Sequence, residues 1–234
     1  SRNVAWLLGL TLAVGLAVTI ARGPWLGAAL SVLVFLLLGP NATARAFKAL
    51  LLVAVGGGLL LVSPWGDKMV DYLPFVGSVD AGSVTYRQRL AEISWTLIQQ
   101  NPFLGTPGFL RYMEELRQGQ GIIDLVNTYA IIALSFGLIG LTMFAGVFAT
   151  VIANSVRLVR RLAAPDPGIS LMGASLVGCM AGALLTIGTV SNYLSIPYLY
   201  WSLAGLAAAY ARVGAQAVPV TMARPRWSPA MPGR

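Results

Sequence analysis

Long apolar runs separated by short polar connections dominate the chain. A helix that crosses a membrane needs about 20 mostly apolar residues, and six runs come close to that length. They lie at about residues 3–21, 24–39, 47–63, 129–153, 169–190 and 193–211. The pattern therefore predicts an all-α fold, a polytopic transmembrane helix bundle of about six spans, with three spans in residues 1–63 and three in residues 129–212.

One long polar stretch, residues 64–128, separates the two groups of apolar runs and holds seven of the eight acidic residues. Within it, residues 84–100 place apolar side chains at helical spacing, with polar side chains on the opposite face. The apolar positions are Tyr86, Leu90, Ile93 and Leu97. We expect an amphipathic helix here, lying on the membrane or on the bundle. A second, short helix is expected at about 109–118, and a disordered tail at 213–234, where proline and arginine are frequent.

The composition excludes a soluble globular domain. Hydrophobic residues make up 57% of the chain and charged residues 10%, whereas a soluble domain carries about 25% charged residues. The net charge of +8 is scattered over span ends rather than gathered in patches, which argues against a nucleic-acid partner. One cysteine allows no internal disulfide, and the absence of histidine removes the commonest metal ligand and general base. Because the chain begins without methionine and opens directly on a span, we expect a piece of a longer protein.

Lysine and arginine near the span ends predict the orientation. When the spans alternate, nearly all of these cations fall on one side, which the positive-inside rule assigns to the cytoplasm. The polar stretch 64–128 then faces outward. Arg22 is the exception, a cation between two spans on the outer side. It either extends to lipid headgroups at a helix end or forms a fixed cation for an anionic ligand, and its position alone does not decide between them.

The outward stretch supplies the candidate chemistry. Arg87 lies at the edge of the apolar stripe, from which it can reach inward. Arg89 falls on the polar face, where the simpler interpretation is solvation or pairing with the acidic residue three positions later. Asp124, Asn127 and Tyr129 stand at the head of the fourth expected span. Helix capping, anchoring at the membrane interface and lining of a site remain open for these three residues.

Four stretches in succession carry a resemblance to a known family. They are Thr19–Gly27, Tyr86–Leu90 with Asn101–Gly105, Asn127–Tyr129 and Ser135–Leu141. Together they resemble the arginine-glycine junction, the external arginine helix with its Pro-Leu-x-Gly turn, the His-Asn-x-Tyr motif and the Gly-Leu-Ile-Gly run of the O-antigen ligase and Wzy-type polysaccharide polymerase family. The resemblance covers roughly residues 19–145.

The resemblance implies a multi-span glycosyltransferase of the bacterial inner membrane. Such an enzyme takes glycan from an undecaprenyl-diphosphate carrier to a glycan or lipid acceptor at the periplasmic face, with no cofactor and no metal, in O-antigen or exopolysaccharide synthesis. Carried over by motif, Arg22 and Arg87 match the arginines held to bind the diphosphate. Arg89, Gln118 and Tyr129 are further substrate-binding candidates. The polar stretch would then be periplasmic, and membrane lipids would surround the bundle.

The chain departs from the family pattern in two respects. Val126 stands where the family has histidine before Asn127. A carboxylate is then the remaining candidate for the general base, and we assign Asp124 with Asn127 as the catalytic pair, with Glu114 and Glu115 as alternatives to Asp124. The family also has about twice as many spans, and the matched portion lies in its C-terminal half.

Two classes of function remain open from the sequence. The first is a lipid-linked polysaccharide polymerase or ligase, and the sequence does not separate these two. The alternative is a non-catalytic polytopic membrane protein, either a transporter half or a polysaccharide-assembly subunit. The middles of the last three expected spans carry no ionisable residue, which argues against a transporter.

Overall fold

The computed structural model describes residues 2–19, 21–39, 81–117, 119, 121–163, 166–191 and 195–217, together with isolated positions between 42 and 51. These residues form helices and connections, with no strand among them. The helices are α1 (Arg2–Val18), α2 (Arg22–Leu38), α5 (Ala81–Gln100), the 3-10 helix η1 (Phe109–Leu116), α6 (Thr128–Leu162), α7 (Pro167–Ile187) and α8 (Ile196–Ala217). The all-α prediction is confirmed for the described part of the chain.

Two of these helices, α6 and α7, are long and apolar enough to cross a membrane by length and composition. Shorter apolar helical stretches lie at Leu7–Leu16 in α1 and at Gly23–Leu38 in α2. The expected third span at 47–63 falls almost entirely outside the described residues. The total of six spans therefore stays a prediction. Helix α8 runs to Ala217, beyond the expected end of the sixth span at residue 211 and into the tail expected from 213.

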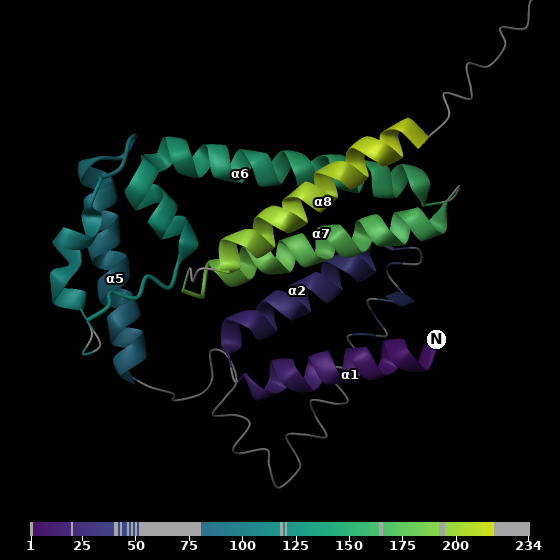
Figure 1. Ribbon diagram of the computed structural model, residues 1–234, viewed down its shortest axis with the longest axis horizontal. Coiled ribbons are helices and arrows are strands. Elements are labelled where there is room, and N and C mark those ends of the chain that lie inside the picture. The colour runs from purple at the N-terminus through teal and green to yellow at the C-terminus, as the bar shows by residue number, and fades with distance from the viewer. Residues whose placement is uncertain are drawn as a thin grey trace, which may run out of the picture.

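Helices α2, α6, α7 and α8 form a bundle, and α1 lies along its side next to α2 (Figure 1). The indole nitrogen of Trp25 in α2 donates to the carbonyl oxygen of Leu16 in α1 at 2.8 Å. Most of the described side chains of α1 are exposed, and Leu12, for example, is 74% exposed. An apolar helix with so much exposed aliphatic surface is typical of a helix that faces lipid.

Small residues bring α2 and α7 together. They recur every four positions on both helices, at Gly23, Gly27 and Ser31 on α2 and at Gly178, Gly182 and Thr186 on α7. A Cβ atom on Gly27 would lie 2.8 Å from the carbonyl oxygen of Gly182, and one on Gly178 would lie 2.6 Å from that of Ser31. Such spacing lets two helix backbones approach closely in a membrane, where van der Waals contact drives association.

Aromatic side chains and one buried hydroxyl join α6 to α8. The rings of Phe144 and Phe148 on α6 pack against Tyr200 and Trp201 on α8, with centroids 5.2 Å apart for Phe148 and Trp201. Farther along, the Ser155 hydroxyl donates to the carbonyl oxygen of Ala207 at 3.2 Å. The packed faces of these two helices are therefore held in a fixed register.

Helix α6 is interrupted at Gly137, inside the expected fourth span at 129–153. Gly137 has φ 67° and ψ −170°, outside the helical region. The preceding turn replaces the lost helical hydrogen bonds. The Thr106 amide donates to the Leu134 carbonyl at 2.7 Å, and the Leu138 amide donates to the Pro102 carbonyl at 2.7 Å. A broken helix at a membrane is tolerated when its freed backbone groups find such partners.

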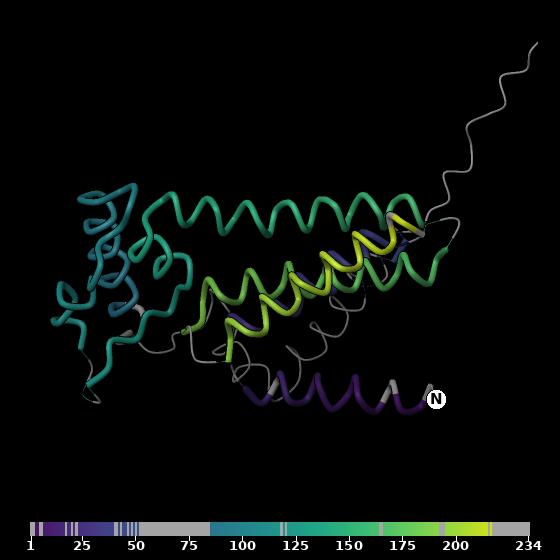
Figure 2. Tube along the Cα trace, turned by 45° about the horizontal axis from the view of Figure 1, so that its top comes forward, coloured from purple at the N-terminus to yellow at the C-terminus, as the bar shows by residue number. Residues whose placement is uncertain are grey.

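Helices α5 and η1 lie at one end of the bundle, where α6 begins (Figure 2). The predicted amphipathic helix is confirmed as α5, and its apolar stripe faces protein. Leu90 and Leu97 are buried, and Tyr86 and Ile93 pack against the same cluster. The cluster also contains residues of η1, of the segment 121–127 and of the first part of α6. The described part of the polar stretch is therefore a folded cap on the bundle.

Candidate functional site

A pocket of about 320 Å³ lies where the cap meets the bundle. Its walls come from α5, from the entry into α6 and from the end of α7. The lining residues are Arg87, Leu90, Ala91, Ser94, Trp95, Ile98, Val126, Asn127, Ala130, Gly188 and Thr189. Two of the seven sequence-predicted site residues, Arg87 and Asn127, are therefore brought into one cavity.

Tyr86 fixes the position of α5 at this pocket. Its hydroxyl donates to the backbone oxygen of Asp124 at 3.1 Å and accepts from the Asp124 amide at 3.0 Å. This pair of bonds ties the start of α5 to the segment that enters α6. Arg87 follows directly in sequence, so its exposed side chain stands beside the entry of α6 rather than on a free helix.

Ser94 buries a hydroxyl group in the pocket wall. The side chain is 4% exposed, and its Oγ atom has no hydrogen-bond partner in the described part of the chain. A buried polar group without a partner costs about 1–3 kcal/mol. A ligand oxygen in the pocket would remove that cost. Ser94 was not among the predicted site residues, although it lies four residues after Leu90 and three before Leu97, on the buried stripe of α5.

Asn127 caps α6. Its Oδ1 atom accepts from the amides of Tyr129 at 2.9 Å and Ala130 at 3.2 Å. Replacing such a cap by alanine typically costs about 1 kcal/mol. The capping role left open by the sequence is therefore present, and the Nδ2 group is the part of this side chain that remains for a ligand.

Tyr129 joins α6 to α7. Its hydroxyl donates to the carbonyl oxygen of Leu184 at 2.6 Å, and its ring packs edge-on against Phe144 at a centroid distance of 6.1 Å. The side chain is half-buried among bundle residues and does not line the pocket. Its described contacts thus hold the bundle together behind the pocket wall.

Arg22 is the first residue of α2, and its side chain lies outside the described part of the structure. The position of the α2 backbone at this point follows from the contacts of the next residue, Gly23. A Cβ atom on Gly23 would collide with the side chain of Thr189, which lines the pocket. The N-terminus of α2 therefore lies behind the wall that faces Arg87. The Ala21 side chain provides no cap, and a helix N-terminus favours negative charge nearby.

Two other predicted site residues that the structure describes, Arg89 and Asp124, are not found in the pocket lining. Arg89 is exposed on α5 and makes no ion pair with Glu92, although both residues are described. The side chain of Asp124 is partly buried, and the residue precedes the lining residue Val126 by two positions. Gln118 lies outside the described residues.

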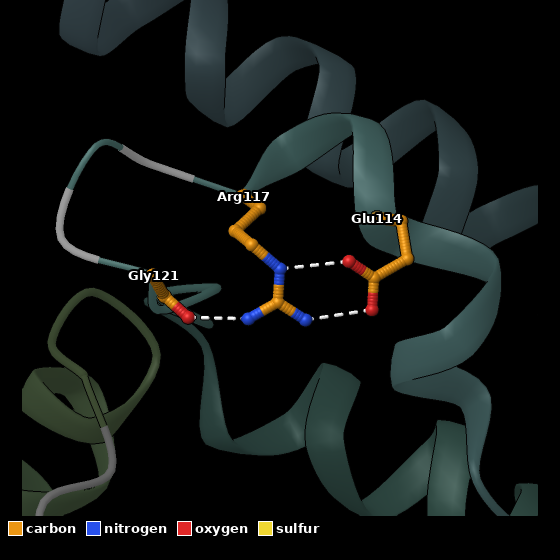
Figure 3. Close-up of polar contacts among 3 residues, drawn as sticks. All are labelled: Glu114, Arg117 and Gly121. Atoms are coloured by element: carbon orange, nitrogen blue, oxygen red, sulfur yellow. Dashed lines mark hydrogen bonds and ion pairs between the residues drawn. The ribbon is translucent and has the colours of Figure 1, made fainter.

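Glu114, an alternative base, is held by Arg117 (Figure 3). The Nε and Nη2 atoms of Arg117 donate to the two carboxylate oxygens at 2.7 and 2.6 Å, and Nη1 donates to the carbonyl oxygen of Gly121. These hydrogen bonds hold the pKa of Glu114 below its ordinary value. A carboxylate that is stabilised in its charged form is a weaker proton acceptor, and Arg117 links Glu114 to the carbonyl group of Gly121.

Comparison with known proteins adds a family assignment. A family model described as O-antigen ligase matches residues 7–145, more than half of the chain. No curated protein and no solved structure matches. The matched segment runs from α1 into the long part of α6 and includes every pocket residue except Gly188 and Thr189.

Proposed function

The chain belongs to the O-antigen ligase family, and from that membership we propose that it is a membrane enzyme that transfers glycosyl groups from a lipid-linked polysaccharide. We further propose that the carrier is undecaprenyl diphosphate and that the cap, with the rest of residues 64–128, faces the periplasm of a bacterial inner membrane. The reaction is proposed to need no metal, and to extend an O-antigen or exopolysaccharide chain.

The observation that carries this proposal is the pocket formed by Arg87, Ser94 and Asn127 at the junction of cap and bundle. A guanidinium group stays charged at all physiological pH values and binds phosphate oxygens in pairs. The N-terminus of α2, which begins with Arg22, lies directly behind the wall at Thr189. Two arginines from distant parts of the chain would thus bind one diphosphate.

These cations would act on the leaving group. As the bond between the sugar and the diphosphate breaks, negative charge grows on the departing phosphate oxygen. Fixed cations and hydrogen-bond donors stabilise that charge without reorganising, which is the largest source of rate enhancement in many enzymes. Arg87 and the Nδ2 group of Asn127 are the proposed donors in the described pocket.

The surroundings of the pocket suit a lipid carrier. Trp95 lines the pocket and is 62% exposed, and tryptophan is enriched where a protein meets the membrane interface. Exposed aliphatic side chains cover α1 and much of α6, for example Leu7 and Met143. A polyprenyl tail can therefore stay in the bilayer while its diphosphate enters the pocket.

For the acceptor, we propose that Asp124 takes the hydroxyl proton. The chain has no histidine, and Glu114 is already paired with Arg117. Asp124 lies on the segment that supplies Val126 and Asn127 to the pocket wall. An Asp124→Asn variant that retains full activity would remove this assignment. Arg89, Gln118 and Tyr129 stay in the proposal as contacts to the glycan beyond the pocket.

The test exchanges the two proposed phosphate-binding residues one at a time. Arg22→Ala and Arg87→Ala are introduced at the chromosomal locus, and the glycan ladder is compared with the amount of protein in the membrane. We expect chain growth to fall at least about a hundredfold in each variant, because loss of one transition-state charge contact costs about 2.7–4 kcal/mol. Arg111→Ala is the matched control, since Arg111 is exposed on η1 and does not line the pocket.

Lysine variants separate charge from geometry. Arg22→Lys and Arg87→Lys keep the charge but lose the planar fork, so partial recovery is expected. Wild-type ladders from both alanine variants would contradict the diphosphate site and favour the non-catalytic alternative. The product distinguishes the two reactions of the family: a lengthened glycan on its carrier indicates a polymerase, and glycan on a different acceptor indicates a ligase.

A further inference from the structure

A second pocket, of about 450 Å³, lies between the last turns of α6 and α8. These turns are at the end of the bundle opposite to α5 and η1 (Figure 1). The pocket is therefore separate from the site described above. Its polar lining consists of Thr150, Asn154, Arg157, Arg161 and Arg212.

The pocket concentrates positive charge. Three guanidinium groups line it, and no carboxylate among the described residues does. Arg157 donates to Asn154 Oδ1 at 3.3 Å, and none of the three arginines forms an ion pair with a described residue. A concave surface lined by one sign of charge attracts ions of the opposite sign.

Topology alone does not explain this arrangement. Cations near the ends of spans mark the cytoplasmic side and interact favourably with helix C-termini, but neither effect requires them to converge on one cavity. Arg160 shows the difference. It is exposed on the same turn of α6 and lies between Arg157 and Arg161 in the sequence, yet it does not line the pocket.

The two walls of the pocket are held in place by packing. The hydrogen bond from Ser155 to the Ala207 carbonyl lies next to the lining residue Asn154. Closer to the helix ends, α8 comes so near to α6 that a Cβ atom on Gly214 would collide with Leu158. A preformed site loses less freedom on binding than one that must first assemble.

The chemistry of the lining indicates the ligand. Beneath the arginines, the walls are apolar and include Val151, Leu158 and Ala208. A phosphate ester attached to a glycerol backbone and acyl chains matches this combination, because basic pockets between spanning helices on the cytoplasmic side bind anionic lipid headgroups. We propose that this basic pocket binds the phosphate of an anionic phospholipid through Arg161 and Arg212, with Arg157 as a third contact.

The experiment measures lipid binding with the full chain. The protein is reconstituted in nanodiscs of phosphatidylcholine with increasing fractions of phosphatidylglycerol, and retained phosphatidylglycerol is counted by native mass spectrometry. The test variant is Arg161→Gln with Arg212→Gln, and Arg160→Gln is the control for surface charge. Loss of one hydrogen bond between a guanidinium group and a phosphate lowers affinity at least about tenfold, whereas loss of one surface charge lowers it about fivefold. We expect the double variant to bind phosphatidylglycerol at least about 100-fold more weakly, and the Arg160 variant to lose no more than about fivefold.

Two further measurements distinguish loss of the lipid site from misfolding and from binding of free phosphate. The double lysine variant at positions 161 and 212 preserves charge and should retain most of the binding, which a misfolded bundle would not. Inorganic phosphate at millimolar concentration should not displace the lipid. Equal loss in the Arg160 control, unchanged binding in the double glutamine variant, or displacement by inorganic phosphate would each overturn the proposal. Because glycan synthesis is not measured, this result is independent of the proposed function.

Discussion

Ser94 shows how one hydroxyl group can have opposite effects on stability and on binding. It is buried in the pocket wall with no partner among the described residues. Ser155 is equally buried, but it donates a hydrogen bond to the Ala207 carbonyl. The same chemical change should therefore have different consequences at the two positions.

We expect Ser94→Ala to leave the thermal stability of the purified protein unchanged or raise it, since an unsatisfied group is removed. Binding of the lipid-linked substrate should become weaker, seen as a higher KM in a reconstituted assay. Ser155→Ala should instead lower the free energy of unfolding by about 1 kcal/mol, the net value of a typical hydrogen bond. A Ser94 variant that loses stability without any change in KM would show that the hydroxyl serves the fold and not the ligand.

At the residue scale, periodicity and the family motifs both pointed to Arg87. The helical spacing of Tyr86 and Leu90 placed Arg87 at the edge of the buried stripe, and the structure puts it in the pocket lining. The same spacing points to Ser94. Spacing could not predict that the start of α2 lies against Thr189, because this contact joins segments far apart in the sequence.

Among the elements, α6 departs furthest from its expected form. Hydropathy reports that a run of residues is apolar, but it contains no information on backbone angles. The break at Gly137 depends on the turn at 101–106, which approaches so closely that a Cβ atom on Gly137 would lie 2.6 Å from the Leu104 nitrogen. The part of α6 after the break, residues 138–162, is about 37 Å long at 1.5 Å per residue, enough to cross a hydrocarbon core of about 30 Å.

The break provides a sharp test at the scale of one helix. Gly137 occupies a backbone conformation that is essentially restricted to glycine and costs other residues about 1–3 kcal/mol. We expect Gly137→Ala to lower the melting temperature of the purified protein. Gly146→Ala is the control, because its Cβ atom would meet nothing within 4 Å and alanine favours a helix. Equal melting temperatures for the two variants would contradict the close packing of the turn at 101–106 against Gly137.

For the whole molecule, the interface between α2 and α7 determines where α2 begins, and Arg22, the second proposed phosphate-binding residue, is its first residue. This interface consists of small residues on both helices, and a Cβ atom on Gly182 would collide with Gly27 and Ser31. Hydropathy predicted both helices, and the four-residue spacing of their small residues, which hydropathy does not report, is visible in the sequence. If α2 is displaced, the residue that begins it, Arg22, moves away from Thr189 and the pocket.

We therefore expect Gly182→Leu to abolish glycan chain growth and to reduce the amount of folded protein recovered in mild detergent, because leucine cannot fit against the backbone of α2. Gly205→Leu on α8 is the matched control, since nothing lies within 4 Å of its Cβ position. Size-exclusion chromatography and the glycan ladder are measured for both variants. A folded, active Gly182 variant would show that close approach of α2 is dispensable.

The hydrogen bonds at Gly137 also bear on the order in which the protein is made. In a straight α6, the Leu138 amide would bond to the Leu134 carbonyl, and the turn at 101–106 now satisfies both of these groups. Straight and broken forms of the helix therefore satisfy the same two groups. Our hypothesis is that α6 enters the bilayer as an uninterrupted helix and breaks afterwards, when the turn docks. Pulse labelling tests this order: if Gly137→Ala failed to insert at the wild-type rate, the break would belong to insertion itself.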